Sequence, residues 1–187
     1  GVLYLDTQDS RGLISAQHNS NVYAARSKVM SEADLVIIVG RKLDYQLAYG
    51  SPAIFSNASF IRISDNPYEL VDNRRGEPEI YAEPKLVFQE INCRELKTNF
   101  DKKWIMEIRN FQNEKIEKFK NNKESYLGDD NKIHPNYIFN CITNLVKENY
   151  IGVADGGDIL SFARVGLNSK YYLDSGVFGC LGVGIPY

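Results

Sequence analysis

A glycine pair at the end of an apolar run is the first place in this sequence where the backbone could do chemistry. The stretch VADGGDIL, residues 153–160, passes from a strand-like run through Gly156 and Gly157 into a helical pattern. Such a turn lets backbone N–H groups approach an anion, and the positive end of the helix dipole adds to the attraction. The same residues also suit a plain tight turn with Asp158 as the N-cap of the helix. Spacing alone favours the plain turn.

Glycine is also dense in the closing run DSGVFGCLGVGIPY, residues 174–187. Its glycines are Gly176, Gly179, Gly182 and Gly184. Glycine at this density lets the backbone come close to a ligand or to another backbone segment. The spacing matches neither the GxGxxG of dinucleotide-binding folds nor a P-loop, since no GK[ST] follows. The run taken alone is equally compatible with a ligand site and with close helix packing.

Charged side chains follow two strand-like runs. Arg41, Lys42 and Asp44 come after ADLVIIVG, and Asp65 comes after SFIRIS. In an open parallel sheet, ligands bind beyond the carboxyl ends of the strands, so these positions suit a nucleotide, with Asp65 on a ribose hydroxyl. The alternative is that they are ordinary surface charges, and that Asp65 starts a turn.

The remaining reactive side chains form no catalytic or metal-binding pattern in the sequence. His18 and His134 have no evident partners, and His134 precedes a proline, which is typical of a helix boundary. Cys93, Cys141 and Cys180 are odd in number and widely spaced. We therefore expect buried, reduced thiols rather than disulfides or a metal site.

The elements that must position these residues alternate between strands and helices. We expect strands at 2–5, 34–40 and 59–64, and helices at 22–33 and 82–96. The run at 34–40 is rich in β-branched residues and suits a strand buried on both faces of a parallel sheet. This order predicts an α/β fold, with a Rossmann-like domain that has a parallel sheet and flanking helices.

The chain changes character after residue 98. Residues 99–133 are rich in charge, with apolar residues at broadly helical spacing, and predict an amphipathic helix followed by a polar linker. Residues 134–187 begin a second α/β unit, with a helix from Pro135, a strand before Gly156 and another short helix. This unit is incomplete, because about 50 residues are too few for an independent domain of this class. We therefore expect a domain at 1–98, a helix and linker at 99–133, and a partial domain at 134–187.

Composition limits the class of protein. A net charge of −2, with 43% hydrophobic and 25% charged residues, predicts a globular chain and argues against nucleic-acid binding. The longest apolar runs fall short of the roughly 20 residues of a membrane helix, and the N-terminus has no secretory-signal order. We expect a cytoplasmic protein whose partners are small molecules or other protein chains.

Four stretches together resemble one enzyme family. AARSKVMSEADLVIIVGRKLDYQLAYG (24–50) and FIRISDNPYELVDNR (60–74) resemble the central domain of thiamine-diphosphate-dependent enzymes of the acetolactate synthase, oxalyl-CoA decarboxylase and 2-hydroxyacyl-CoA lyase group. VADGGDILSFAR (153–164) and YLDSGVFGCLGVGIPY (172–187) resemble the start of their diphosphate-binding domain. The resemblance implies a central domain at 1–98 without its first strand and helix, and a truncated cofactor-binding domain at 134–187.

The resemblance also implies roles for individual residues. The cofactor's diphosphate would lie against a turn that consists of Asp155, Gly156, Gly157 and Asp158. Backbone groups at Gly179 and Leu181 would hold its aminopyrimidine ring. The bulk of Leu181 would keep the cofactor bent, with its amino group near the thiazolium carbon, so that catalysis depends on positioning.

A second ligand is implied for the central domain, where relatives bind FAD, ADP or neither. The matching positions are Arg26, Arg41 or Lys42, and Asp65. Lys42 stands where relatives commonly have Arg, and it lacks the bidentate geometry that Arg offers to phosphate. Asp158 stands where relatives often have Asn or a Gln-His pair. An ionised Asp repels phosphate unless Mg²⁺ or a capping role intervenes.

The resemblance predicts an enzyme that makes or breaks a carbon–carbon bond next to a carbonyl. Acetolactate-synthase-like action on a 2-oxo acid is the leading interpretation. A 2-hydroxyacyl-CoA lyase or oxalyl-CoA decarboxylase is the alternative, favoured by KLDYQLAYG (42–50) over the twin-aspartate loop of acetolactate synthases. The implied cofactors are thiamine diphosphate and Mg²⁺, and the implied assembly is a homodimer or homotetramer.

The resemblance places the catalytic glutamate in a preceding domain and the Gly-Asp-Gly metal motif beyond residue 187. We therefore expect an interior piece of the enzyme that has no catalytic or metal-binding residue of its own and is inactive alone. The rival from another class is a non-catalytic, Rossmann-like nucleotide-binding module.

Overall fold

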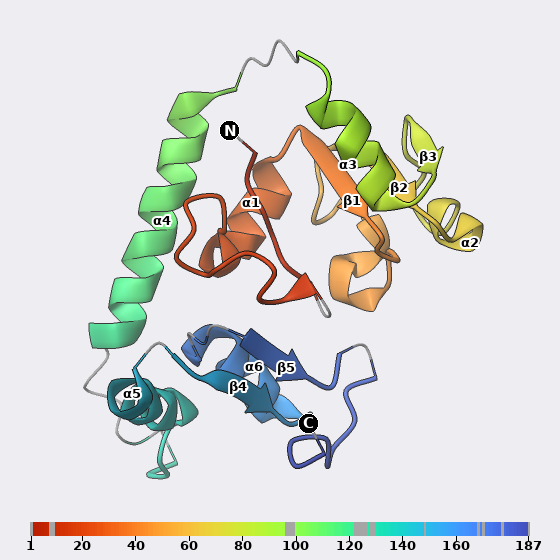
Figure 1. Cartoon of the computed structure of the whole chain (residues 1–187). Coiled ribbons are helices and arrows are strands. Elements are labelled where there is room, and N and C mark those ends of the chain that lie inside the picture. Colours follow the sequence, from red (N-terminus) through yellow and green to blue (C-terminus); the bar gives the residue numbers. More distant parts are fainter. Residues whose placement is uncertain are drawn as a thin grey trace. The chain divides into compact units, whose positions relative to one another are not determined.

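The chain forms two compact units in the computed structural model (Figure 1). One unit combines Gly1–Arg26 with Asp101–Tyr187, and the other is Ser27–Phe100. The structure describes residues 2–7, 10–95, 100–121, 127, 130–147, 149–167, 169, 171–176 and 178–186. The division expected from the sequence, at 1–98, 99–133 and 134–187, stays a prediction.

A three-stranded parallel sheet forms the centre of Ser27–Phe100. Strands β1 (Leu35–Val39), β2 (Ser59–Ser64) and β3 (Glu79–Tyr81) lie in that order across the sheet. Both strand pairs are parallel, so the predicted parallel sheet is confirmed. The short strand β3 was not predicted from the sequence.

Strand β1 differs from its predicted burial. Leu35, Ile37 and Val39 are 49%, 44% and 37% exposed, whereas Ile38 is buried. Within the described residues β1 is an edge strand of the sheet. The β-branched run therefore identified the strand correctly, but the prediction of burial on both faces was wrong. The strand predicted at 2–5 was also wrong, since Tyr4 forms only an isolated bridge with Asn21.

Prolines begin three of the helices. α2 (Pro67–Leu70), α3 (Pro84–Asn92) and α5 (Pro135–Val146) each have proline in the first turn. The missing proline N–H costs nothing there, and the fixed φ suits a helix. The helix predicted over 22–33 begins as a 3₁₀ turn, η2 (Tyr23–Ala25), and continues as α1 (Arg26–Glu32).

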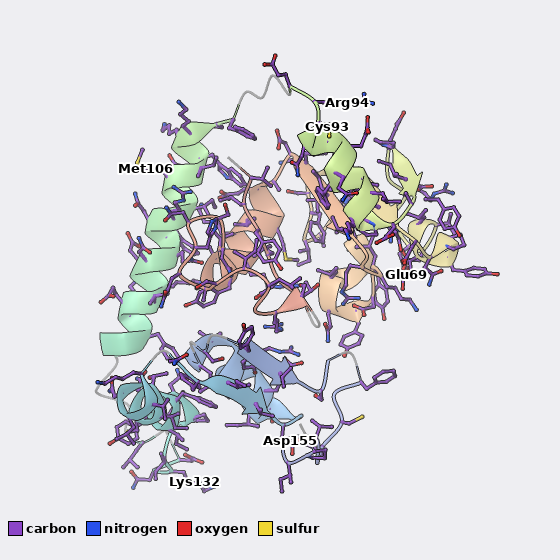
Figure 2. All side chains as sticks on the ribbon, in the orientation of Figure 1. Glu69, Cys93, Arg94, Met106, Lys132 and Asp155 are labelled. Carbon is purple, nitrogen blue, oxygen red and sulfur yellow. The ribbon has the colours of Figure 1, made fainter. Side chains whose placement is uncertain are left out.

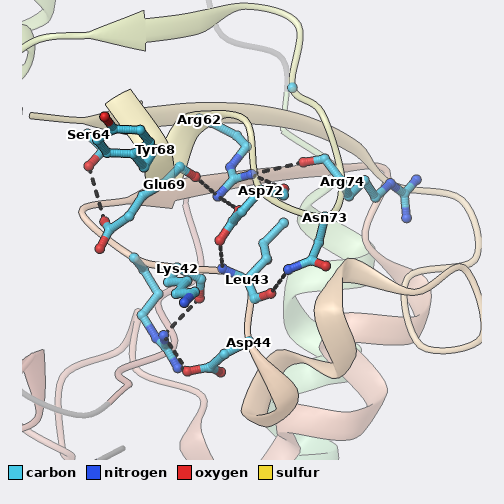
Figure 3. A network of polar contacts seen from close by, with 12 residues as sticks. Lys42, Leu43, Asp44, Arg62, Ser64, Tyr68, Glu69, Asp72, Asn73 and Arg74 are labelled. Carbon is cyan, nitrogen blue, oxygen red and sulfur yellow. Dashed lines mark hydrogen bonds and ion pairs between the residues drawn. The ribbon is translucent and has the colours of Figure 1, made fainter. Parts of the chain in front are cut away.

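A buried guanidinium connects the loops of the unit Ser27–Phe100 to its sheet (Figure 3). Arg62 on β2 is 1% exposed. Its Nη1 donates to the carbonyls of Asp72 and Arg74 at 2.7 and 3.0 Å, and Nη2 donates to the carbonyl of Glu69. The Asp72 carboxylate pairs with Arg62 and accepts a hydrogen bond from the Leu43 N–H at 3.1 Å. Arg62 thus donates hydrogen bonds to these carbonyls, as the N–H groups of a neighbouring strand would do in a sheet.

Arg74 has a similar role in the segment between η3 (Tyr45–Gly50) and β2. Its guanidinium donates to the carbonyls of Gly50, Phe55 and Ala58 at 3.0, 3.1 and 2.6 Å. The same group lies 4.4 Å from the ring centroid of Phe60. Phe60 and Phe55 are themselves in edge-to-face contact in the core.

The other unit contains a β-α-β arrangement. Strands β4 (Ile151–Ala154) and β5 (Tyr171–Asp174) are parallel neighbours, joined through α6 (Asp158–Gly166). A buried apolar cluster in this arrangement contains Phe139 from α5 together with Ala154, Leu160 and Ala163. An added Cβ at Gly166 would lie 2.6 Å from Phe139 Cβ, so glycine permits α5 and α6 to approach closely. The predicted second α/β unit is therefore present.

Helix α4 (Lys102–Asn121) packs on the N-terminal segment of the same unit. Ile108 is fully buried. The Gln112 side chain donates to the Asn21 carbonyl at 2.8 Å and accepts from the Ala24 N–H at 3.1 Å. Met106 is 59% exposed and points away from these contacts (Figure 2). The amphipathic helix was predicted, but its attachment to residues 19–25 was not.

The three cysteines are more exposed than the sequence predicted. Cys93 and Cys180 are exposed and Cys141 is half-buried, all with free thiols. The expectation of buried cysteines was therefore wrong.

In the part of the chain that the structure describes, no helix is both long and apolar enough to cross a membrane.

The Arg62 network can be tested against a surface arginine. Arg62→Met should lower the free energy of unfolding by about 3–5 kcal/mol, because it removes one partner of a buried ion pair and leaves carbonyls without donors. Arg94→Met is the matched control. Arg94, labelled in Figure 2, is 68% exposed and pairs with Glu90, which is 66% exposed. That exposed pair is worth about 0–1 kcal/mol. Urea unfolding measures both, and equal losses in the two variants would contradict the role of Arg62.

Candidate cofactor site

The two glycine-rich segments meet in the structure. An added Cβ at Gly156 would lie 2.5 Å from the Gly179 carbonyl oxygen and 2.3 Å from that of Cys180. An added Cβ at Gly157 would lie 3.4 Å from Leu181 Cδ2. Only glycine at position 156 leaves room for these carbonyls. The structure thus brings together two segments that are distant in the sequence and that the resemblance assigned to one cofactor.

The Asp155 carboxylate joins these segments (Figure 2). Its Oδ1 accepts from the N–H groups of Gly156 and Val183 at 2.8 and 3.1 Å, and Oδ2 accepts from Gly182 N–H at 2.9 Å. These donors, Gly156 first, hold the pKa of Asp155 below its usual range, because they favour the ionised form. The contact is therefore present at neutral pH and is lost only as the pH falls through that lowered pKa.

The start of α6 differs from the plain-turn interpretation. Gly157, with φ +81°, is the N-cap, and Asp158 is the first helical residue rather than the cap. The Leu160 N–H donates to the Gly157 carbonyl at 3.2 Å. The first N–H groups of a helix have no acceptor within it, so those of Asp158 and Ile159 can receive an anion. The Gly156 N–H already donates to Asp155, which leaves this anion site to the helix start.

A second group of charges stabilises the beginning of the closing run. Asp174 Oδ2 lies 2.9 Å from Arg164 Nε on α6 and 3.6 Å from Arg11 Nε. Its Oδ1 accepts from the Gly176 N–H at 2.7 Å. Burial lowers the pKa of Arg11, and the like charge of Arg164 lowers it further. Burial also raises the pKa of the neighbouring Asp6. No pattern in the sequence predicts this cluster, because its members are far apart along the chain.

The residues expected at a nucleotide site are placed differently. The Arg41 guanidinium forms a bidentate ion pair with Asp44, at 2.9 and 3.0 Å, so its paired donors are turned toward that carboxylate. Lys42 and Asp65 are exposed in the segments that follow β1 and β2. Arg26 begins α1 and belongs to the other compact unit. The structure therefore does not bring the four residues together in one unit.

Part of the chain matches a known enzyme family. Residues 1–91 match the family described as "Thiamine pyrophosphate enzyme, central domain". The match covers slightly less than half of the chain, which is similar there to the thiamine pyrophosphate enzymes. The family implies thiamine diphosphate as cofactor.

Relatives with two kinds of name match almost the whole chain. 2-hydroxyacyl-CoA lyase 1 of Mus musculus is 25% identical over 98% of this chain and 32% of its own length. 2-hydroxyacyl-CoA lyase 2 of Homo sapiens is 24% identical over 95% of this chain and 29% of its own length. An acetolactate synthase large subunit of Mycobacterium tuberculosis is 27% identical over 95% of this chain and 32% of its own length. The chain thus spans about a third of the length of the curated relatives it matches.

The exposed surface of the two glycine segments suits one part of thiamine diphosphate better than the other. Leu181 is 76% exposed, and Gly179 has open space where a Cβ would be. An apolar side chain beside an open backbone fits a flat heterocycle. The start of α6 fits the anionic end, except that the exposed Asp158 carboxylate opposes it. Among the described residues, no group of three His, Cys, Asp or Glu could hold a metal ion.

The close approach at Gly156 is testable by adding one methyl group. Gly156→Ala should lower the free energy of unfolding by about 1–3 kcal/mol or displace residues 179–183, because the new Cβ would overlap two backbone carbonyls. Gly184→Ala is the matched control, since its Cβ would make only ordinary contacts of 3.7 Å or more with Asp155. Thermal unfolding and the amide chemical shifts of residues 179–183 measure both effects. A Gly156→Ala protein indistinguishable from the control would contradict the contact.

Proposed function

We propose that the chain provides part of an enzyme that uses thiamine diphosphate to make or break a carbon–carbon bond next to a carbonyl. The observation that carries the proposal is the contact between the turn Asp155–Gly157 and the run Gly179–Val183. These segments lie in the same chain as a thiamine pyrophosphate enzyme central domain. The cofactor, when bound, would supply a nucleophilic thiazolium carbon for addition to a carbonyl and a cationic ring that stabilises the electron pair of the breaking bond.

The residues of this chain bind and orient the cofactor. The exposed Leu181 and the open backbone at Gly179 support the ring. The N–H groups at the start of α6 take the diphosphate. We include Mg²⁺ in the proposal, because a divalent cation offsets the repulsion between Asp158 and the phosphate oxygens. A homodimer or homotetramer is proposed on the family resemblance.

Three substrate classes remain for this reaction: a 2-oxo acid, a 2-hydroxyacyl-CoA and oxalyl-CoA. Acetolactate-synthase-like action on a 2-oxo acid agrees with the mycobacterial relative. Cleavage of a 2-hydroxyacyl-CoA agrees with the mammalian relatives and with the sequence of residues 42–50, which lacks a twin aspartate. In that segment Asp44 is bound to Arg41.

Cofactor binding can be measured on the chain itself. Titration with thiamine diphosphate and Mg²⁺ in a calorimeter should give saturable binding. Leu181→Ala should weaken binding by about tenfold. The ring of the cofactor would lose a contact whose free energy is roughly that of burying a leucine side chain. Ile185→Ala is the matched control, since Ile185 is 98% exposed in the same run and is not part of the proposed ring contact. Binding of ADP or FAD without binding of thiamine diphosphate would instead support a nucleotide-binding module.

The substrate class is tested on the protein expressed from the complete gene. With thiamine diphosphate and Mg²⁺ present, we expect turnover either of two pyruvate molecules to acetolactate and CO₂, or of a 2-hydroxyacyl-CoA to a shorter aldehyde and formyl-CoA. Oxalyl-CoA is included as the third substrate. Product analysis by mass spectrometry separates these outcomes. A protein that binds the cofactor but turns over none of the three would contradict the proposed substrate classes.

A further inference from the structure

The segment 178–186 lacks both regular secondary structure and buried large apolar side chains. It contains no helix or strand. Its large apolar side chains Phe178, Leu181 and Ile185 are 85%, 76% and 98% exposed. Burial of apolar surface therefore contributes little to its position.

Polar contacts from Asp155 take the place of that burial. Among the described residues, the hydrogen bonds that join 178–186 to the rest of the chain run from the Gly182 and Val183 N–H groups to Asp155. The bond between the Cys180 thiol and the Phe178 carbonyl is internal to the segment. The same carboxylate is bound to the Gly156 N–H of the turn before α6. One side chain thus fixes the distance between both halves of the proposed cofactor site.

The geometry points to Asp155 as a positioning residue: we propose that it fastens the ring-holding run 179–183 to the turn before α6 and does not itself contact the cofactor. This inference rests on the proposed function. It reassigns Asp155, which the resemblance placed among the residues in contact with the diphosphate.

Charge and acceptor capacity support the reassignment. A carboxylate has about four lone-pair positions, and three N–H groups already occupy positions on Asp155. An ionised carboxylate also repels a diphosphate, whereas it stabilises N–H groups directed at it.

The length of the aspartate side chain matters as well. Oδ1 accepts from the N–H of the very next residue, Gly156, at 2.8 Å, while both oxygens also reach the other segment. Glutamate would place its carboxylate one methylene further out. Asparagine keeps the length but replaces one acceptor oxygen with an NH₂ donor that faces an N–H group.

Amide hydrogen exchange tests the fastening without any cofactor. In the full 187-residue chain, Asp155→Asn should make the Gly182 and Val183 amides exchange about three- to tenfold faster, because a hydrogen bond to a charged acceptor is lost. Asp130→Asn is the matched control, since Asp130 also accepts a backbone N–H, that of Lys132, in the segment before α5. Amides of Gly182 and Val183 that exchange at the same rate in the wild type and in Asp155→Asn would overturn the proposal.

Cofactor affinity then separates positioning from a purely structural role. Asp155→Asn should weaken thiamine diphosphate binding by about fivefold or more, because a smaller fraction of molecules has the run 179–183 in the competent place. Asp155→Glu should restore part of that loss. The thermal unfolding midpoint should stay close to that of Asp130→Asn.

The remaining outcomes are also decisive. Faster exchange with unchanged cofactor affinity would overturn the positioning role and leave a local structural contact. Loss of affinity together with a large fall in the unfolding midpoint would assign Asp155 to global stability instead. A wild-type chain that binds no thiamine diphosphate would contradict the proposed function, and the positioning role with it. The exchange data would still decide whether Asp155 fastens the two segments.

Discussion

Backbone groups outside helices and strands must find hydrogen-bond partners, and this constraint shapes both units of the chain. The strands are short, with three residues in β3 and four in each of β4 and β5. Much of the backbone therefore lies in connecting segments, where ladder bonds are absent. Side chains supply the partners: Arg62 and Arg74 in one unit, Gln112 and Asp155 in the other. Each satisfies backbone groups of a different segment of the chain, so each also fixes the position of that segment.

The sequence predicted those features that depend on neighbours along the chain. The β-branched run of β1, the apolar spacing of α4 and the prolines that begin α3 and α5 all concern local conformation. Predictions that depend on distant neighbours were less successful. The predictions that β1 and the cysteines are buried were wrong, because the exposure of a residue depends on which other residues pack against it. The attachment of α4 through Gln112 has no periodic pattern in the sequence.

The candidate site also contains some features that the sequence predicted and others that it did not. Gly156, Gly157 and the closing run were selected from composition and family resemblance, and the structure places these segments in contact. The hydrogen bonds from the Gly182 and Val183 N–H groups to Asp155 were not predictable. They connect residues that are 27 and 28 positions apart, and the spacing of residues in the sequence does not indicate that these segments meet. The opposite case is Arg41. Its ion pair with Asp44 spans only three positions, so the sequence contained the signal that this arginine already had an acceptor.

Two acidic residues lie in the turn of the proposed anion site, but their environments differ. The Asp155 charge is directed at three N–H groups, which lower its pKa and hold it in the ionised state. Asp158 is exposed in the first turn of α6, where it stabilises the helix dipole but opposes a phosphate. The carboxylate nearest the two glycine segments is therefore part of their framework. The electrostatic cost of binding a diphosphate would therefore fall on Asp158 and not on Asp155.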